Sequence, residues 1–217
     1  MKVLEVKKIG FRMPYPDLSE ISEKLDGQET RMPAGEVNWE KFPYKPDLAF
    51  SIGYTDNELL LKYYITEDCF KAEITETNQA VYEDSCVEFF VSPGNDGIYY
   101  NLEFNGIGTC LGGAGTDRNN RTRLKPELIA KIRRLTSAGK EPVAERQGKF
   151  SWTITIAIPF EVFLFHEIKS LKGKTFRVNF YKCGDKLKVP HYITWNPVQT
   201  EKPDFHQPSF FGQLVFV

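Results

Sequence analysis

Alternating apolar and polar side chains run through most of the chain after residue 47. Residues 48–54 and 58–65 alternate on either side of the turn-forming sequence Thr-Asp-Asn, which predicts a hairpin. Shorter alternating runs cover residues 86–91, 99–105, 176–180 and 214–216. In the clearest run, five apolar side chains share one face: Phe150, Trp152, Ile154, Ile156 and Ile158. Short period-two segments joined by turns predict an all-β, antiparallel β-sandwich of immunoglobulin or jelly-roll type.

Helical periodicity is confined to a few short segments. After Pro16, four residues recur at helical spacing before Gly27, which would end the helix: Leu18, Ile21, Ser22 and Leu25. Residues 126–135 predict a second short helix, and residues 160–168 a helical turn. Residues 1–36 are rich in proline and charge, and we expect them to form an N-terminal extension packed on a single domain of residues 37–217.

Composition and charge narrow the possible functions. The 217 residues carry a formal net charge of −1, which argues against a nucleic-acid partner. No apolar run could span a membrane, and the N-terminus lacks the apolar core of a signal peptide. As written, the sequence predicts a cytoplasmic protein, or a secreted or periplasmic one if a leader has been removed. The cysteines form no CxxC pair, so free, mostly buried thiols are expected: Cys69, Cys86, Cys110 and Cys183.

Two neighbouring predicted strands combine one apolar face with one polar face. The polar face gathers Asp84, Glu88, Asn101, Glu103 and Asn105. Carboxylates and amides can accept and donate hydrogen bonds to the adjacent hydroxyls of a sugar. The pattern alone favours the alternative, which is an ordinary solvated sheet face.

Three aromatic residues are candidates for either core packing or ligand stacking. Trp195 lies in a polar, proline-rich stretch expected to be a loop, and Tyr82 lies in a turn just before a predicted strand. Either ring could be buried or could present a face to the apolar side of a sugar. Trp152 shares a strand face with four apolar residues, so we expect it in the core.

Several segments together resemble the family 9 carbohydrate-binding modules, which are related to DOMON-like sandwiches. These are "VYEDSCVEFFVSPGNDGIYYNLEFNGIG", "WTITIAIPFEVF", "TFRVNFYK", "ITWNPV" and "FHQPSFFGQLVF". Their order and spacing carry the resemblance, which covers about residues 37–217. It implies a β-sandwich that binds a sugar in a slot between two aromatic rings.

The resemblance assigns roles to particular residues. Trp195 and Tyr82 match the two ring positions, although the family usually has tryptophan at both. Glu88 matches an acid that hydrogen-bonds sugar hydroxyls, whereas Asn101 and Glu103 stand where the family carries a basic and an amide residue. No cofactor is required, but structural calcium is common in the family. The only ligands suggested for calcium are Asn95 and Asp96, in an acidic turn.

Non-catalytic binding of a glycan is therefore the expected function, and two alternatives remain open. Glu88 and Glu103 could serve a glycoside hydrolase, and such modules occur attached to xylan-degrading enzymes, in a setting of polysaccharide catabolism. A haem-binding DOMON-like domain would need an axial ligand, but all three methionines lie in the N-terminal segment. Residues 112–123, rich in glycine and arginine, are expected to form a mobile solvated loop rather than a site for phosphate or an acidic sugar. His206 is expected to be structural.

Overall fold

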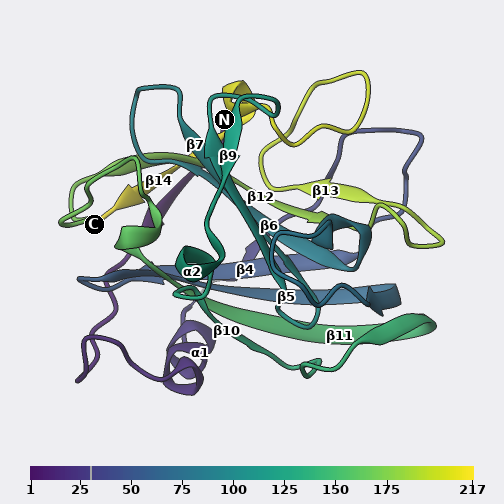
Figure 1. Cartoon of the computed structure of the whole chain (residues 1–217), viewed down its shortest axis with the longest axis horizontal. Coiled ribbons are helices and arrows are strands. Elements are labelled where there is room, and N and C mark those ends of the chain that lie inside the picture. The colour runs from purple at the N-terminus through teal and green to yellow at the C-terminus, as the bar shows by residue number, and fades with distance from the viewer. Residues whose placement is uncertain (30) are drawn as a thin grey trace.

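The computed structural model describes residues 1–29 and 31–217, which form two β-sheets packed face to face (Figure 1). The larger sheet runs in the order β1-β14-β12-β6-β7-β8-β9, and β13 joins it by pairing with β12 and β3. Its strands are β1 (Val3–Val6), β3 (Glu36–Val37), β6 (Cys86–Ser92), β7 (Tyr99–Asn105), β8 (Cys110–Gly115), β9 (Arg121–Arg123), β12 (Thr175–Cys183), β13 (Tyr192–Thr194) and β14 (Gly212–Phe216).

The second sheet is antiparallel, in the order β10-β11-β5-β4-β2. Its strands are β2 (Met32–Pro33), β4 (Asp47–Tyr54), β5 (Glu58–Ala72), β10 (Arg133–Thr136) and β11 (Val143–Pro159). Helix α1 (Leu18–Asp26) covers its outer face, where Ile21 and Leu25 are buried (Figure 1). The other helical elements are α2 (Pro126–Ile129) and the single 3₁₀ turns η1 (Val81–Glu83), η2 (Phe160–Val162) and η3 (Pro208–Phe210).

The main core lies between the two sheets and follows the alternation of the strands. Val87, Phe89 and Val91 of β6 are all fully buried in it. Phe50 of β4 stacks on Phe180 of β12, with ring centroids 3.8 Å apart. Trp152 is 3% exposed in the same core, as its strand pattern predicted. The predicted antiparallel β-sandwich is therefore confirmed.

The N-terminal residues contribute strands to both sheets, because β1 pairs with β14, β2 with β4 and β3 with β13. One local prediction is wrong. The helix expected over residues 126–135 ends at Ile129. Residues 133–136 instead form β10, an edge strand on β11, because pairing with that long strand outweighs a weak helical pattern.

The outer face of the larger sheet is also covered by protein. Loops from both ends of the chain lie over it and form a second cluster of buried side chains, which we call the outer cluster: Trp39, Val81, Cys86, Phe90, Tyr99, Leu111, Tyr181, Cys183, Val198, Phe205 and Phe211. The polar face of β6 and β7, for which the sequence pattern favoured exposure to solvent, is thus mostly buried. A ligand can reach the polar groups on this face only through an opening between the loops. None of the helices within residues 1–29 and 31–217 has the length and apolar character needed to cross a membrane.

Candidate functional site

One pocket opens through the loops onto the outer face of the larger sheet. Its volume is about 90 Å³, which is room for several water molecules. Strands β6, β7 and β12 supply the floor, and β9 and the loop around residue 204 supply the walls. Its lining combines four acids, two arginines and a group of rings: Glu88, Glu103, Asp185, Asp204, Arg118, Arg121, Tyr82, Tyr192, Phe205 and His206.

The floor is formed by two carboxylates on neighbouring strands. Glu88 of β6 and Glu103 of β7 are directly opposite each other in the antiparallel register, and each is 3% exposed. Cys183 Sγ donates to Glu88 Oε1 over 3.1 Å, and Asn101 Nδ2 donates to Glu103 Oε1 over 2.8 Å. Glu103 Oε2 is buried without a hydrogen-bond partner among the residues that the structure describes. One oxygen of the floor therefore has an unused capacity to accept a hydrogen bond.

Burial changes the protonation of these acids. It raises the pKa of Glu88 well above the ordinary value, and the charge of Glu103 raises it further. Burial also raises the pKa of Glu103 to about 7, against the opposing charge of Arg121. The pKa of Asp185 rises to about 6, again mainly through burial. Because like charges on facing strands repel, the two floor carboxyls together retain a proton near neutral pH.

Aromatic side chains form the upper part of the pocket. Tyr82 in η1 and Tyr192 in β13 are half-buried, and Phe205 stacks on Tyr181 with centroids 4.2 Å apart and planes 9° apart. His206 is hydrogen-bonded to Tyr99 Oη over 2.8 Å, which fixes its ring. Apolar ring surface above hydrogen-bonding acids is the combination that a sugar requires.

The pocket histidine is a neutral, structural residue. Arg121 Nη1 donates to His206 Nε2 over 3.0 Å, and burial together with the nearby arginine charges lowers the pKa of His206 to about 3. A haem in this pocket would need an axial ligand. All three methionines lie outside the pocket lining, and His206 already has its hydrogen-bond partners.

The structure corrects the expectation for Trp195. Its side chain is 1% exposed and lies in the core between the sheets, where its ring meets Phe50 and Phe180 edge-on at 6.0 and 5.5 Å. The physical reason is strand alternation, because Trp195 follows Ile193 by two residues and points to the same, inner face. Of the expected ring pair, Tyr82 alone lines the pocket.

Two other residues of the polar face hold a loop in place instead of lining the pocket. Asp84 Oδ2 accepts hydrogen bonds from the backbone N–H groups of Glu73 and Ile74 over 3.0 and 2.9 Å, and from Asn105 Nδ2 over 3.0 Å. Lys71 Nζ lies 3.4 Å from Asp84 Oδ1. These contacts fix the segment that leads into η1, and so help to position Tyr82.

Sequence patterns did not identify several pocket residues. Residues 112–115 belong to β8, where a Cβ added to Gly115 would lie 2.1 Å from the carbonyl oxygen of Asn120, so the hairpin needs glycine there. Asp117 caps its turn by accepting from the backbone N–H groups of Asn119 and Asn120. This hairpin brings Arg118 and Arg121 to the pocket. In the sequence, the arginines of residues 112–123 were the one feature that suggested a binding role for this segment. No feature of the sequence marked Asp185, Tyr192 or Phe205 as pocket residues.

Two groups of side chains within residues 1–29 and 31–217 are candidates for metal binding. Asn95 is exposed, and Asp96 Oδ2 lies 3.2 Å from His166 Nε2, so calcium at this turn stays a prediction. The one group of three His, Cys, Asp or Glu side chains close enough to share an ion is Cys86, Glu88 and Cys183, within 4.8 Å of one another. All four cysteines are free and buried, as expected.

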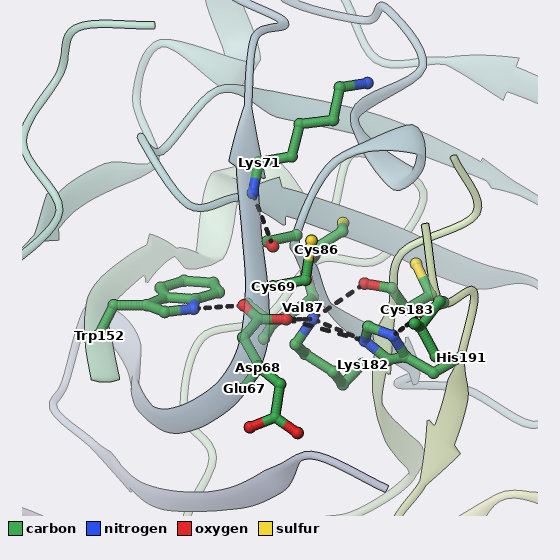
Figure 2. Close-up of polar contacts among 12 residues, drawn as sticks. Glu67, Asp68, Cys69, Lys71, Cys86, Val87, Trp152, Lys182, Cys183 and His191 are labelled. Carbon is green, nitrogen blue, oxygen red and sulfur yellow. Dashed lines mark hydrogen bonds and ion pairs between the residues drawn. The ribbon is translucent and has the colours of Figure 1, made fainter. Parts of the chain in front are cut away.

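A second polar cluster lies on the opposite face of β12, inside the sandwich (Figure 2). Lys182 Nζ is 2.8 Å from Glu67 Oε2, and it lies 2.9 Å from His191 Nε2. Trp152 Nε1 donates to Glu67 Oε1 over 2.7 Å. The three charged or titratable residues are fully or almost fully buried, and burial together with the Lys182 charge lowers the pKa of His191 to about 2. This network joins β5, β11, β12 and the segment before β13 directly beneath the pocket floor.

Comparisons with known proteins agree with this architecture. Over its full length the chain matches the crystal structure of a protein from Bacteroides uniformis ATCC 8492 proposed to bind carbohydrate, with 41% identity, 99% of that chain covered and a TM-score of 0.96. A family 9 carbohydrate-binding module from Caldicellulosiruptor kristjanssonii in complex with glucose matches with 12% identity, covering 100% of this chain and 96% of that one, at a TM-score of 0.57. A family 9 module from the same organism in complex with cellotriose gives 13% identity, 99% coverage of this chain and 93% of that one, and a TM-score of 0.56.

Sequence comparison decides the family. No curated protein is similar enough to count as a match. The sequence profile described as "Carbohydrate-binding family 9" matches residues 20–216, which is nearly the whole chain. The chain belongs to carbohydrate-binding family 9.

Proposed function

We propose that this protein binds a glycan, without cleaving it, in the pocket on the outer face of the larger sheet. The observation that carries the proposal is the arrangement of rings above buried acids. Tyr82 offers a half-buried ring at the pocket wall, and Glu88 and Glu103 offer carboxyl groups at its floor. The ring would pack on the apolar face of one sugar unit while the carboxyls hydrogen-bond its hydroxyls.

The size and position of the pocket suggest what part of a glycan would enter. A pocket of about 90 Å³ is too small to enclose several sugar units. The neighbours from Caldicellulosiruptor kristjanssonii hold glucose and cellotriose, and the Bacteroides uniformis protein is itself proposed to bind carbohydrate. We therefore propose that a single unit, or one end of a chain, enters the pocket.

The carboxyl arrangement favours binding over hydrolysis. A glycosidase needs one acid on each side of the scissile bond. Glu88 and Glu103 project from adjacent strands of one sheet face, so both would approach a sugar from the same side. Hydrolysis by this chain alone would be excluded by incubating it with xylan, cello-oligosaccharides and aryl glycosides and finding no new reducing ends. Turnover lost in Glu88→Gln would instead identify a hydrolase.

A glycan array followed by calorimetry on the sugars that bind tests the proposal. Tyr82→Ala should weaken binding of any such sugar by about 2 kcal/mol or more, because truncating a stacking ring removes a binding hot spot. Tyr15→Ala is the matched control, since Tyr15 is exposed and lies outside the pocket lining. Unchanged affinity in Tyr82→Ala, or no sugar bound from the whole array, would contradict the proposal.

A further inference from the structure

The pocket carries more negative than positive charge. Four acids line it against two arginines, which leaves an excess of two acids when all are ionised. The arginines are partly engaged, because Arg118 lies 3.9 Å from Asp204 and Arg121 donates to His206. Neither floor carboxylate forms an ion pair with any residue that the structure describes. The negative charge of the floor is therefore not balanced by cationic side chains of the protein.

The unpaired oxygen on the floor points to a ligand with a donor group. Glu103 Oε2 has no hydrogen-bond partner among the described residues, although Glu103 is 97% buried and lines the pocket. A buried acceptor without a partner is costly, and a buried carboxylate more so. Among the described residues, the side chain of Glu88, directly opposite on β6, receives only the weak thiol donor of Cys183. A charged donor placed between the two would satisfy both.

We infer that the pocket prefers an amino sugar, whose ammonium group would lie between Glu88 and Glu103 while its ring packs against Tyr82. This inference rests on the proposed glycan-binding function and names the chemical class of the ligand. Glu103 Oε2 and Glu88 would each accept from the ammonium N–H groups. A charge-assisted hydrogen bond in a desolvated site is stronger than one from a neutral hydroxyl, and this difference produces the preference.

Binding would also displace a proton. Near neutral pH the facing carboxyls retain one, because burial raises the pKa of both and the charge of Glu103 further raises that of Glu88. An ammonium group between them favours the ionised form, so that proton passes to solvent as the sugar enters. The other charged or titratable groups around the two carboxyls include Tyr63 from β5, Tyr82 from η1, Cys86 from β6, Cys110 from β8, Arg121 and Arg123 from β9, Tyr181 and Cys183 from β12, and Asp185 beyond it.

A matched set of sugars tests the inference by calorimetry on the intact chain. The set is glucose, glucosamine, N-acetylglucosamine and glucuronic acid, together with cellotriose and the deacetylated glucosamine trisaccharide. At pH about 6.5 we expect glucosamine to bind about tenfold more tightly than glucose, and glucuronic acid to bind most weakly. Repeating the titration in two buffers of different ionisation enthalpy should reveal proton release with glucosamine and none with glucose.

Variants identify the groups responsible. Glu103→Gln and Glu88→Gln, each made separately, should reduce the ratio of glucosamine to glucose affinity to about twofold or less. Asp56→Asn removes an exposed carboxylate paired with Lys8, outside the pocket, and should leave the ratio unchanged. If either glutamine variant fails to fold, the sugar series and the proton release measured on the unmodified chain still test the preference for an amino sugar.

Four outcomes would overturn the inference. Equal affinity for glucose and glucosamine would leave glycan binding intact while removing the charge preference, whereas no binding to any sugar would remove both. Tighter binding of glucuronic acid would show that Arg118 and Arg121 control selection. The last outcome concerns zinc chloride. If zinc binds with one-to-one stoichiometry, if Cys86→Ser abolishes that binding, and if amino sugars show no preference, then the cation bound by this floor is a metal ion.

Discussion

Tyr82 and Trp195 lie on opposite faces of the larger sheet. Tyr82 packs against the outer cluster and lines the pocket, whereas Trp195 is buried between the two sheets with Phe50 and Phe180. The two rings therefore have different physical roles, one available to a ligand and one to the core. Their substitutions should separate binding from stability.

Replacing Trp195 should affect stability. Trp195→Ala is expected to lower the free energy of unfolding by about 3–5 kcal/mol, because it leaves a large cavity between the sheets. Urea unfolding followed by circular dichroism measures the loss. Trp195→Phe, which keeps most of the core volume, provides a folded protein for calorimetry and should bind sugar as the unmodified chain does. If a folded Trp195→Phe variant no longer bound sugar, Trp195 would be part of the binding site.

The facing carboxyls should make stability depend on pH. Burial raises the pKa of Glu103 from its ordinary 4.5 to about 7, so the folded protein binds more protons than the unfolded chain between these values. The stabilisation is complete below about 4.5 and is lost as the pH rises through about 7. His206 and His191 act in the opposite sense at acidic pH, since burial lowers the pKa of both.

A comparison with Glu103→Gln isolates the carboxyl contribution, because the variant keeps both histidines. Between pH about 5 and about 8, we expect its free energy of unfolding to rise relative to that of the unmodified chain by more than about 1 kcal/mol. Urea unfolding at four pH values measures the difference, and Asp56→Asn, an exposed site, should give none. A difference that does not change with pH would mean that Glu103 is not protonated in the folded state.

Breaking the buried pair beneath the floor should be costly. Lys182→Met leaves Glu67 buried without its cation and is expected to lower the free energy of unfolding by about 3–5 kcal/mol. The double variant Lys182→Met with Glu67→Gln should recover part of this loss, since the amide can still accept from Trp152. A double-mutant cycle by urea unfolding measures the coupling.

An exposed ion pair provides the control for that cycle. Lys8→Met removes the partner of Asp56 at the surface and should cost no more than about 1 kcal/mol. If Lys182→Met were equally mild, the buried network would contribute nothing to the fold.

The thiols should be unreactive in the folded protein. Burial raises the pKa of Cys69, Cys86 and Cys110 to about 12 and that of Cys183 well above its ordinary value, so little thiolate forms near neutral pH. Iodoacetamide at pH about 8 should label none of the four quickly, while in urea all four should react. Mass spectrometry counts the labels. Rapid labelling of Cys183, which lines the pocket, would show that the pocket admits reagents more freely than its burial implies.

Local patterns along the sequence determined most of the secondary structure. The alternation at residues 48–54, 58–65, 86–91 and 150–158 predicted strands that the structure contains, because a strand with one face in a core must repeat every two residues. Helix α1 ends at Asp26, just before the Gly27 that was expected to stop it. Glu88 and Glu103 were found in the same way, as polar positions on otherwise apolar strands.

Only the tertiary structure decided which face of each strand is open to a ligand. Both faces of the larger sheet are covered, so the burial of Trp195 and the accessibility of Tyr82 depend on which loops cross which face. Arg121, Asp185 and Phe205 line the same pocket as Glu88, although they come from segments far away in the sequence. Alternation reports the direction of a side chain relative to its own strand, whereas a pocket forms where distant segments fail to close over a sheet, and that depends on long-range packing.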